Sequence, residues 1–410
     1  MTAAAPPRVL VIAPFTHQNG HFVTFPRDVC CGLAASGCDV TLVHARPFRT
    51  ELDWFGHPIR KICLKDLVDD SPRLWRELWA RLASHPSSQC LAWVIWRMKP
   101  ANFDLVLWTD FQAQANVWPL AITRRLGVYR FRSAFFEHHP PEDEGSEEPH
   151  HASILDVQRL RLGNVPMIVF SRSHLASWRA RLGMKPHIEY LPYGVWPRPL
   201  DSNARAEARV QLNIAPEVRV VLVFGVQAVK RKNLDTLLDA LQGFSPRRPL
   251  MLLFVGKTIG GQAHPFLGWN AVDITVRVDD RFVSESDMNR YFAATDAVWA
   301  NYRDFPGASG ALQQAIGFGR MVIASDGGEI HEICKEHQLG ITVESPTSEG
   351  IQNSFVQLLD IDGPTQLELE RHIANVASRY SWDRVMGTLH HRFIGALHDG
   401  CSLQTNSVEK

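Results

Sequence analysis

Short apolar runs recur along the chain and alternate with segments of helical periodicity. Continuous apolar runs are typical of strands that are buried on both faces of a parallel sheet. In the first half we predict such strands over residues 9–13, 40–44, 105–108, 134–137 and 167–170. Residues 27–36 have helical spacing, and Gly37 follows them as a stop signal. Helices between the strands would supply the crossover connections of a doubly wound sheet.

The same alternation starts again near residue 218. Apolar runs predict strands over residues 218–224, 249–255, 297–300 and 321–324, and helical spacing predicts helices over residues 235–241, 287–294 and 309–318. The segment 192–217 is rich in proline and polar residues, so we interpret it as the connection between two α/β halves. Ligands of such sheets bind beyond the carboxyl ends of the strands.

The charge balance argues against nucleic acid as the main partner. Lys plus Arg equals Asp plus Glu at 43 each in 410 residues, whereas phosphate binding usually leaves a basic excess. The first half is mildly basic and the second mildly acidic. This is a weak indication of an anionic acceptor, and chance variation in surface charge is the simpler interpretation.

Cysteine usage and the N-terminus indicate a cytoplasmic protein. The seven cysteines form no CxxC pair and no spacing typical of disulfides, which fits a reducing compartment. The N-terminus lacks the apolar region of a signal peptide. No apolar stretch reaches the roughly 18 residues of a membrane span.

A basic loop follows the strand predicted at 218–224. In FGVQAVKRKNLD, Gly225 stands at the strand end, and Arg231 and Lys232 come just before a helix. Glycine lets the backbone approach a ligand closely, and a basic pair at a helix start suits a diphosphate. A solvated surface pair is the alternative interpretation.

A glycine- and serine-rich loop follows the strand predicted at 297–300. In YRDFPGASGALQQ, Ser309 is a good N-cap, and the free N–H groups of the helix start can bind phosphate or sugar hydroxyls. An ordinary crossover between two strands would explain the same residues.

These segments, taken in order, resemble the retaining glycosyltransferases of the GT-B fold, family 4 (glycosyltransferase group 1) in particular. RVLVIAPF, NGHF, FFEHH, YLPYGVWP and RYSWDRVMGTL are similar to the family's segments over nearly the whole chain. The resemblance implies an α/β protein of two facing, Rossmann-like, doubly wound domains with a cleft between them. Residues 1–196 would form the acceptor-side domain, residues 197–382 the nucleotide-sugar donor domain, and residues 383–410 a helix returning to the first domain with a tail.

The resemblance also implies a reaction and its residues. A hexosyl group would move from a nucleoside diphosphate sugar to an acceptor hydroxyl with retention at the anomeric carbon, without a metal or another cofactor. His138, Arg231 and Lys232 would be catalytic, although a solvated loop histidine is the alternative for His138. The donor would be bound by Gly20, Gly225, Arg231, Lys232, Arg281, Pro306, Gly307, Ala308, Ser309, Gly310 and Gln314. The acceptor side would hold Asn19, His21, His138 and His139.

Two positions depart from the family pattern. The family usually carries Glu-x7-Glu across the donor loop, and here those positions are Pro306 and Gln314. The resemblance implies that Gln314 accepts hydrogen bonds from the ribose hydroxyls. An amide oxygen is a weaker acceptor than a carboxylate. Backbone groups of residues 307–310 would then contact the sugar. At Val226 many members have an arginine for the diphosphate.

Two segments carry further candidate chemistry. Residues 138–151 are rich in His and acids, but their spacing fits no regular metal site, so we expect a lid or acceptor loop. Residues 72–99 combine tryptophans with basic residues, which is typical of plain core contacts or of a helix lying on a membrane.

The sequence does not identify the acceptor, which would be a saccharide, a lipid-linked molecule or a small molecule. Peripheral contact with the inner membrane face stays an alternative to a freely cytoplasmic protein.

Other functions are compatible with the same pattern. The loss of both glutamates would suit a non-catalytic GT-B protein that binds a sugar or a partner. A nucleotide-sugar epimerase or a phosphorylase is the rival within enzymes.

Overall fold

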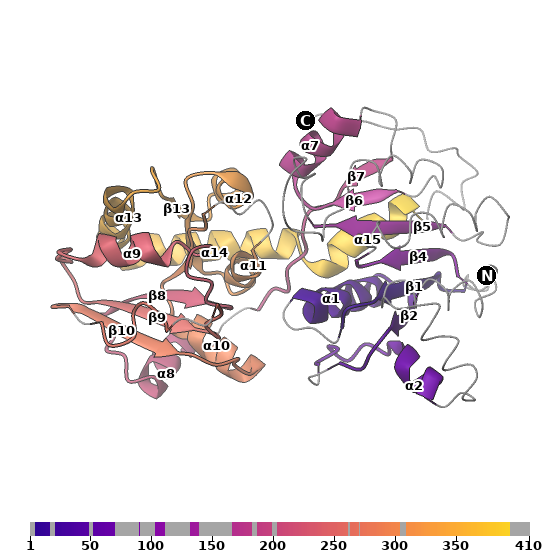
Figure 1. Ribbon diagram of the computed structural model, residues 1–410, viewed down its shortest axis with the longest axis horizontal. Helices are drawn as coiled ribbons and strands as arrows, with labels where there is room; N and C mark the ends of the chain where they lie inside the picture. Colours follow the sequence, from indigo (N-terminus) through magenta and orange to yellow (C-terminus); the bar gives the residue numbers. More distant parts are fainter. Residues whose placement is uncertain are drawn as a thin grey trace. The chain divides into compact units, whose positions relative to one another are not determined.

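The chain divides into two compact units. The computed structural model describes residues 5–16, 21–48, 52–69, 90, 103–110, 132–138, 166–182, 187–198, 203–260, 263–269, 271–303 and 309–393. The first unit comprises Met1–Gly194 and Trp382–Lys410, and the second comprises Val195–Ser381 (Figure 1).

The first unit is built on a parallel sheet of seven strands in the order β3-β2-β1-β4-β5-β6-β7. The strands are β1 (Arg8–Ala13), β2 (Asp39–His44), β3 (Arg60–Cys63), β4 (Leu105–Trp108), β5 (Ser133–Glu137), β6 (Met167–Val169) and β7 (Ile188–Tyr190). Its described helices are α1 (His21–Ala35), α2 (Leu64–Asp69), α7 (Arg172–Leu182) and α15 (Trp382–Phe393).

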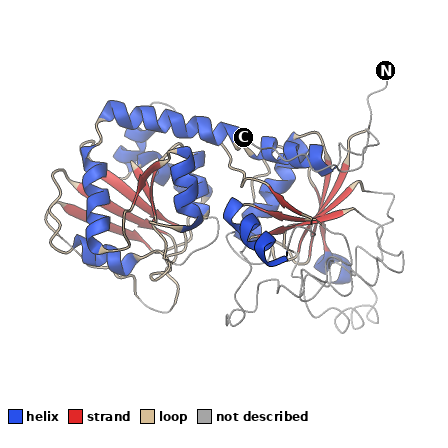
Figure 2. Cartoon of the chain, turned by 90° about the horizontal axis from the view of Figure 1, so that it is seen from above, coloured by secondary structure: helices blue, strands red, loops and turns tan. Residues whose placement is uncertain are grey.

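The second unit is built on a parallel sheet of six strands in the order β10-β9-β8-β11-β12-β13. The strands are β8 (Arg219–Phe224), β9 (Leu250–Val255), β10 (Ile274–Asp279), β11 (Ala297–Ala300), β12 (Met321–Ala324) and β13 (Gly340–Thr342). The helices are α8 (Ala204–Gln211), α9 (Leu234–Leu241), α10 (Glu285–Ala294), α11 (Gly310–Gly317), α12 (Gly328–His337), α13 (Ser348–Asp360) and α14 (Gly363–Arg379). Helices lie on both faces of this sheet (Figure 2).

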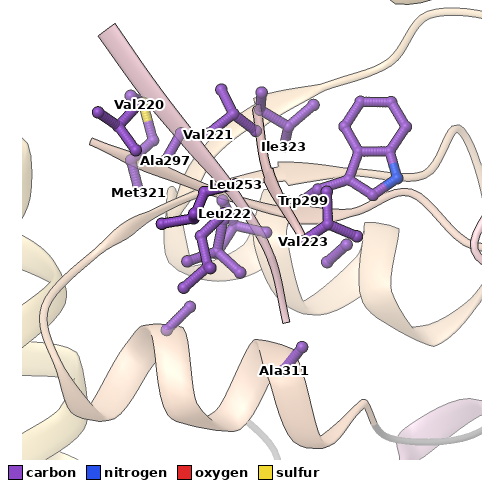
Figure 3. Close-up of a cluster of buried hydrophobic side chains, with 14 of the residues drawn as sticks. Val220, Val221, Leu222, Val223, Leu253, Ala297, Trp299, Ala311, Met321 and Ile323 are labelled. Atoms are coloured by element: carbon purple, nitrogen blue, oxygen red, sulfur yellow. The ribbon is translucent and has the colours of Figure 1, made fainter. Parts of the chain in front are cut away.

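The central strands of the second unit form its core. Every residue of β9, β11 and β12 is buried, and side chains of β8 and β11 pack together in the cluster of Figure 3, with Ala311 of α11 close by. These are the continuous apolar runs of the sequence, because a strand covered on both faces has no position left for a polar side chain. The predicted doubly wound α/β domains are therefore confirmed in both units.

Four strands escaped prediction: β3, β7, β10 and β13. All four are the outermost strands of their sheets. Their residues are largely half-buried or exposed, so they lack the continuous apolar run on which the prediction relied.

In both sheets the strand order reverses at the first strand of the unit. The reversal lies between β1 and β4 in the first sheet and between β8 and β11 in the second. The connections leave these neighbouring strands in opposite directions, which opens a crevice beyond their carboxyl ends. Each unit therefore has one edge position that is prepared for a ligand.

Helix α15 is part of the first unit, where it packs against α1. Trp382 at its start is fully buried, with ring centroids 5.7 Å from Phe25 and 5.3 Å from Tyr193. The indole lies against Gly194, where an added Cβ would come within 2.3 Å of the ring. Among the described residues, no helix has the length and apolarity needed to cross a membrane.

Gly194→Ala should destabilise the first unit. The new methyl group would overlap the Trp382 ring, and overpacking of a buried site typically costs about 1–3 kcal/mol. Chemical denaturation would measure the loss in the free energy of unfolding. Gly387→Ala on α15 is the matched control, because a Cβ there meets only Ser36 Oγ at 3.5 Å. Since alanine favours a helix over glycine, the control should be neutral or stabilising. Equal losses in both variants would contradict the proposed packing.

Candidate functional site

The crevice of the second unit lies where β8 and β11 end. Gly225 follows β8 with φ +87°, a left-handed conformation that favours glycine. Gly256 follows the neighbouring strand β9 with φ +137°, and an added Cβ there would lie 2.1 Å from the Gly225 carbonyl oxygen. The two glycines let the loops after β8 and β9 pack backbone against backbone.

Lys232 is the central residue of this edge. Its side chain is almost completely buried, at 2% exposure. The ammonium donates to the carbonyl of Phe224, the last residue of β8, and lies 3.4 Å from the Tyr302 hydroxyl and 5.3 Å from the centroid of that ring. Burial lowers the pKa of Lys232, and the Tyr302 contacts partly oppose this shift. Among the residues that the structure describes, no carboxylate forms an ion pair with this ammonium.

Tyr302 joins Lys232 to the start of α11. Ser309 is the N-cap of α11, and its oxygen accepts a hydrogen bond from the N–H of Leu312. The Ser309 hydroxyl donates to the Tyr302 oxygen at 3.0 Å. The structure thus brings together two predicted donor residues, Lys232 and Ser309, through a third that sequence analysis missed. A tyrosine two residues beyond a buried strand was the available signal, because the carboxyl edge is where such sheets bind ligands.

Arg303 fixes the turn that carries Lys232. Its guanidinium donates to Asn233 Oδ1 at 2.6 Å and Thr236 Oγ1 at 2.7 Å, and it forms an ion pair with Asp235 at 3.3 Å. Its backbone N–H donates to the Arg231 carbonyl at 2.8 Å. Asn233 adopts a left-handed conformation with φ +53°, which turns the chain into α9. Sequence analysis missed Arg303 as well.

The remaining predicted donor residues are spread along the same edge. Arg231 is exposed, Gly310 begins α11, and Gln314 is half-buried one turn further along that helix. Arg281 lies apart from them, beyond the outermost strand β10, where it pairs with Asp279 at 2.9 Å and Asp287 at 3.0 Å. Pro306, Gly307 and Ala308 lie outside the described residues.

The crevice of the first unit holds His138, which follows β5. Its Nε2 lies 3.2 Å from the carbonyl oxygen of Thr109, which follows the neighbouring strand β4. A carbonyl only accepts, so this nitrogen carries the hydrogen. The ring stacks on Phe170 and meets Phe25 edge to face, with centroid distances of 5.2 and 4.7 Å. The histidine ring is therefore held in one orientation.

Other residues predicted for the acceptor side are described only in part. His21 is the first residue of α1. Asn19, His139 and the loop 139–150 lie outside the described residues, as do Gly20, which was predicted to bind the donor, and the segment 72–99 except Cys90. Within the described part of the chain, no group of three His, Cys, Asp or Glu side chains could hold a metal ion. The expected independence from metals stays a prediction.

A buried carboxyl group was also missed. Glu329 lies in the first turn of α12, beyond the end of β12, and is 3% exposed. Burial, and to a smaller degree the neighbouring charge of Glu332, raises the pKa of Glu329 to about 8. A glutamate next to two glycines reads as an exposed helix start in the sequence, which is why periodicity did not reveal it.

The second unit matches a known family. Residues 218–360 match the family model described as glycosyl transferases group 1. A search of curated proteins gives no match. The predicted resemblance is thereby confirmed for this part of the chain, while retention and the altered Glu-x7-Glu pattern stay predictions.

Solved structures match the fold over nearly the whole chain. Sucrose-phosphate synthase from Thermosynechococcus elongatus is 17% identical, with 96% of this chain and 98% of that chain covered and a TM-score of 0.64. Anabaena HepE, solved with UDP and glucose, is 16% identical, with coverages of 94% and 98% and a TM-score of 0.64. WaaG, a glycosyltransferase of lipopolysaccharide biosynthesis, is 14% identical, with coverages of 95% and 100% and a TM-score of 0.61. The two parallel-sheet domains therefore have the fold of GT-B glycosyltransferases.

Glu329→Gln should make stability less dependent on pH. The unfolded chain loses this proton near pH 4.5, whereas the folded protein keeps it to about pH 8. Stability therefore falls as pH rises between these values, by up to about 5 kcal/mol, and stays flat above them. The variant should match the wild type at pH 4.5 and exceed it at pH 9 in urea denaturation. Glu336→Gln, at an exposed position of the same helix, is the control. A parallel pH dependence of Glu329→Gln and wild type would contradict the prediction.

Proposed function

We propose that this protein transfers a sugar from a nucleoside diphosphate sugar to an acceptor hydroxyl, and that the diphosphate binds where β8 and β11 end. The observation that carries the proposal is the buried Lys232 ammonium, which has no ion pair with any described carboxylate. Taking a charge out of water is costly unless an opposite charge accompanies it. A diphosphate would supply that charge.

The surroundings of Lys232 suit a leaving diphosphate. When the bond to the sugar breaks, negative charge develops on the phosphate oxygen, and fixed positive groups in a site with little water stabilise it most. Lys232 is such a group. The start of α11 adds free N–H groups and the positive end of the helix dipole, and Ser309 fixes this start next to Tyr302.

The comparisons favour a uridine donor as the first one to test. HepE has been solved with UDP and with UDP-glucose. The group 1 match covers the strands and helices that build the edge around Lys232. Transfer of a hexosyl group with retention, and without a metal, rests on the resemblance of the sequence. By the same resemblance, His138 would contact the sugar or the acceptor.

We place the reaction in the cytoplasm. The six cysteines within the described residues are all free, as in proteins of a reducing compartment. The acceptor is a saccharide, a lipid-linked or a small molecule, and contact with the inner membrane face through residues 72–99 belongs to the lipid-linked case.

A non-catalytic sugar-binding protein is the second candidate. Pro306 and Gln314 stand where the family usually carries its two glutamates. A protein that only binds could lose both carboxylates and keep Lys232 for the diphosphate.

Donor binding followed by donor hydrolysis tests both functions. A melting-temperature panel of UDP-, GDP-, dTDP- and ADP-sugars identifies the donor, because a ligand that binds only the folded protein raises its melting temperature. Slow release of free sugar from that donor supports transfer. Binding without any release supports the second candidate, and no shift with any donor contradicts both.

Lys232→Met and Arg231→Ala should each weaken donor use. Removing a cation from the leaving diphosphate should lower kcat/KM by roughly tenfold or more, which is about 1.4 kcal/mol. Steady-state kinetics with the identified donor would measure this. Lys335→Met, at an exposed position of α12, is the control and should keep full activity. Unchanged kinetics in both test variants would contradict the site.

Gln314 should accept a ribose hydroxyl. Gln314→Glu should keep or increase affinity for the nucleoside diphosphate, because a carboxylate is the stronger acceptor. Gln314→Leu should weaken binding by about 1–3 kcal/mol, since a buried hydroxyl would lose its partner. Calorimetry decides, with Gln313→Leu at the adjacent position as control. Equal affinities in wild type, Glu and Leu variants would mean that Gln314 does not touch the donor.

A further inference from the structure

Tyr302 occupies the position at which the two ends of the candidate donor site meet. Lys232 reaches it from the loop after β8, and Ser309 reaches it from the start of α11. Its ring also lies under the Lys232 ammonium, 5.3 Å from the centroid. A residue that touches both is in a position to contact a ligand that binds to both.

Two of the described partners of the Tyr302 hydroxyl are hydrogen-bond donors. The Ser309 hydroxyl donates to it at 3.0 Å, and the Lys232 ammonium, which can only donate, lies 3.4 Å away. The phenol oxygen thus faces a hydroxyl donor and a cationic donor. Accepting bonds from a hydroxyl and a cation polarises the oxygen and makes its own O–H a better donor.

Two residues near Lys232 do not supply another hydrogen-bond donor of this kind to a diphosphate. Val226, which follows Gly225, has an apolar side chain and cannot supply a second group to a diphosphate. Arg303, the first cation after β11, is occupied with Asn233, Asp235 and Thr236. Tyr302 lies between the two loops and contacts Lys232 directly.

We propose that Tyr302 is a catalytic residue, whose hydroxyl donates a hydrogen bond to the leaving diphosphate beside Lys232. This inference rests on the proposed function. The bond between the anomeric carbon and the phosphate oxygen breaks, and its electron pair stays on the diphosphate. A new bond forms from the acceptor oxygen to the anomeric carbon, and the acceptor's proton leaves to the diphosphate or to solvent. Tyr302 keeps its own proton throughout, and its bond strengthens as the phosphate oxygen gains charge.

Tyr302→Phe tests the role with little change in shape. The ring that faces Lys232 remains and only the hydroxyl is lost. We expect kcat to fall roughly tenfold or more with a smaller change in the donor KM, because the bond is strongest once charge has developed. Affinity for the free nucleoside diphosphate, which carries that charge, should fall more than affinity for the donor.

The same substitution in Lys232→Met protein distinguishes direct contact with the diphosphate from positioning of Lys232. If Tyr302 acts only by holding Lys232, Tyr302→Phe will change nothing further in Lys232→Met protein, and the proposal is overturned. If Tyr302 touches the diphosphate, the Phe variant will weaken nucleoside diphosphate binding in that background too, as calorimetry can measure.

Tyr380→Phe is the matched control, because this tyrosine caps the far end of α14. It should leave kcat and binding unchanged, and a loss equal to that of Tyr302→Phe would overturn the assignment. Wild-type protein that binds and turns over a donor, combined with an unaffected Tyr302→Phe variant, refutes only the role of Tyr302. Wild-type protein that binds no nucleoside diphosphate refutes the proposed function itself.

Discussion

The burial of one ammonium group determines the construction of the candidate site in the second unit. Lys232 is buried, and contacts from β8, from β11 and from Tyr302 hold it there. The Phe224 carbonyl at the end of β8 accepts from it, and the indole of Trp299 in β11 donates to its backbone carbonyl at 3.0 Å. The chain turns at Asn233, which has a left-handed conformation, and Arg303, just beyond β11, donates to the Asn233 side chain. A cation kept out of water in this way is a prepared partner for an anion, so local architecture and chemistry have the same cause.

The two edges of the second sheet carry different kinds of polar groups: ion pairs that join elements at the amino edge, and the candidate site at the carboxyl edge. At the amino edge of the second sheet, Asp296 pairs with Arg209 at 2.7 Å and accepts from the Val220 backbone at 2.8 Å, while Arg320 and Glu370 pair at 3.2 Å. These contacts tie α8 and α14 to the strands. At the carboxyl edge the polar groups are arranged around the point where the strand order reverses. The first unit follows the same principle with Thr109 and His138, although different residues occupy the crevice.

The sequence predicted the inner structure of both sheets well and the contacts at the edge only in part. Strands such as β9 and β12 are visible because covering both faces demands an unbroken apolar run. Lys232 and Ser309 were found because each belongs to a local pattern of strand, loop and helix. Tyr302 and Arg303 were missed because their importance arises from contacts about 70 residues away in the chain, which no local pattern records. Arg281 was predicted from its place just beyond a strand end, and its ion pairs with Asp279 and Asp287, which no local pattern records, became visible only in the structure.

The chain enters and leaves the second unit at the same place. Val195 and Ser381 are its first and last residues, and they form a parallel β-bridge in which the Val195 N–H donates to the Tyr380 carbonyl at 2.9 Å. The second unit is therefore an insertion in the first one along the chain, and its two ends are paired with each other by this bridge. Segments whose ends are adjacent can be exchanged between proteins without disturbing the host, because the host has only one small gap to close. The architecture therefore allows the second unit to be exchanged by recombination as a single segment, while the recipient keeps its own sheet.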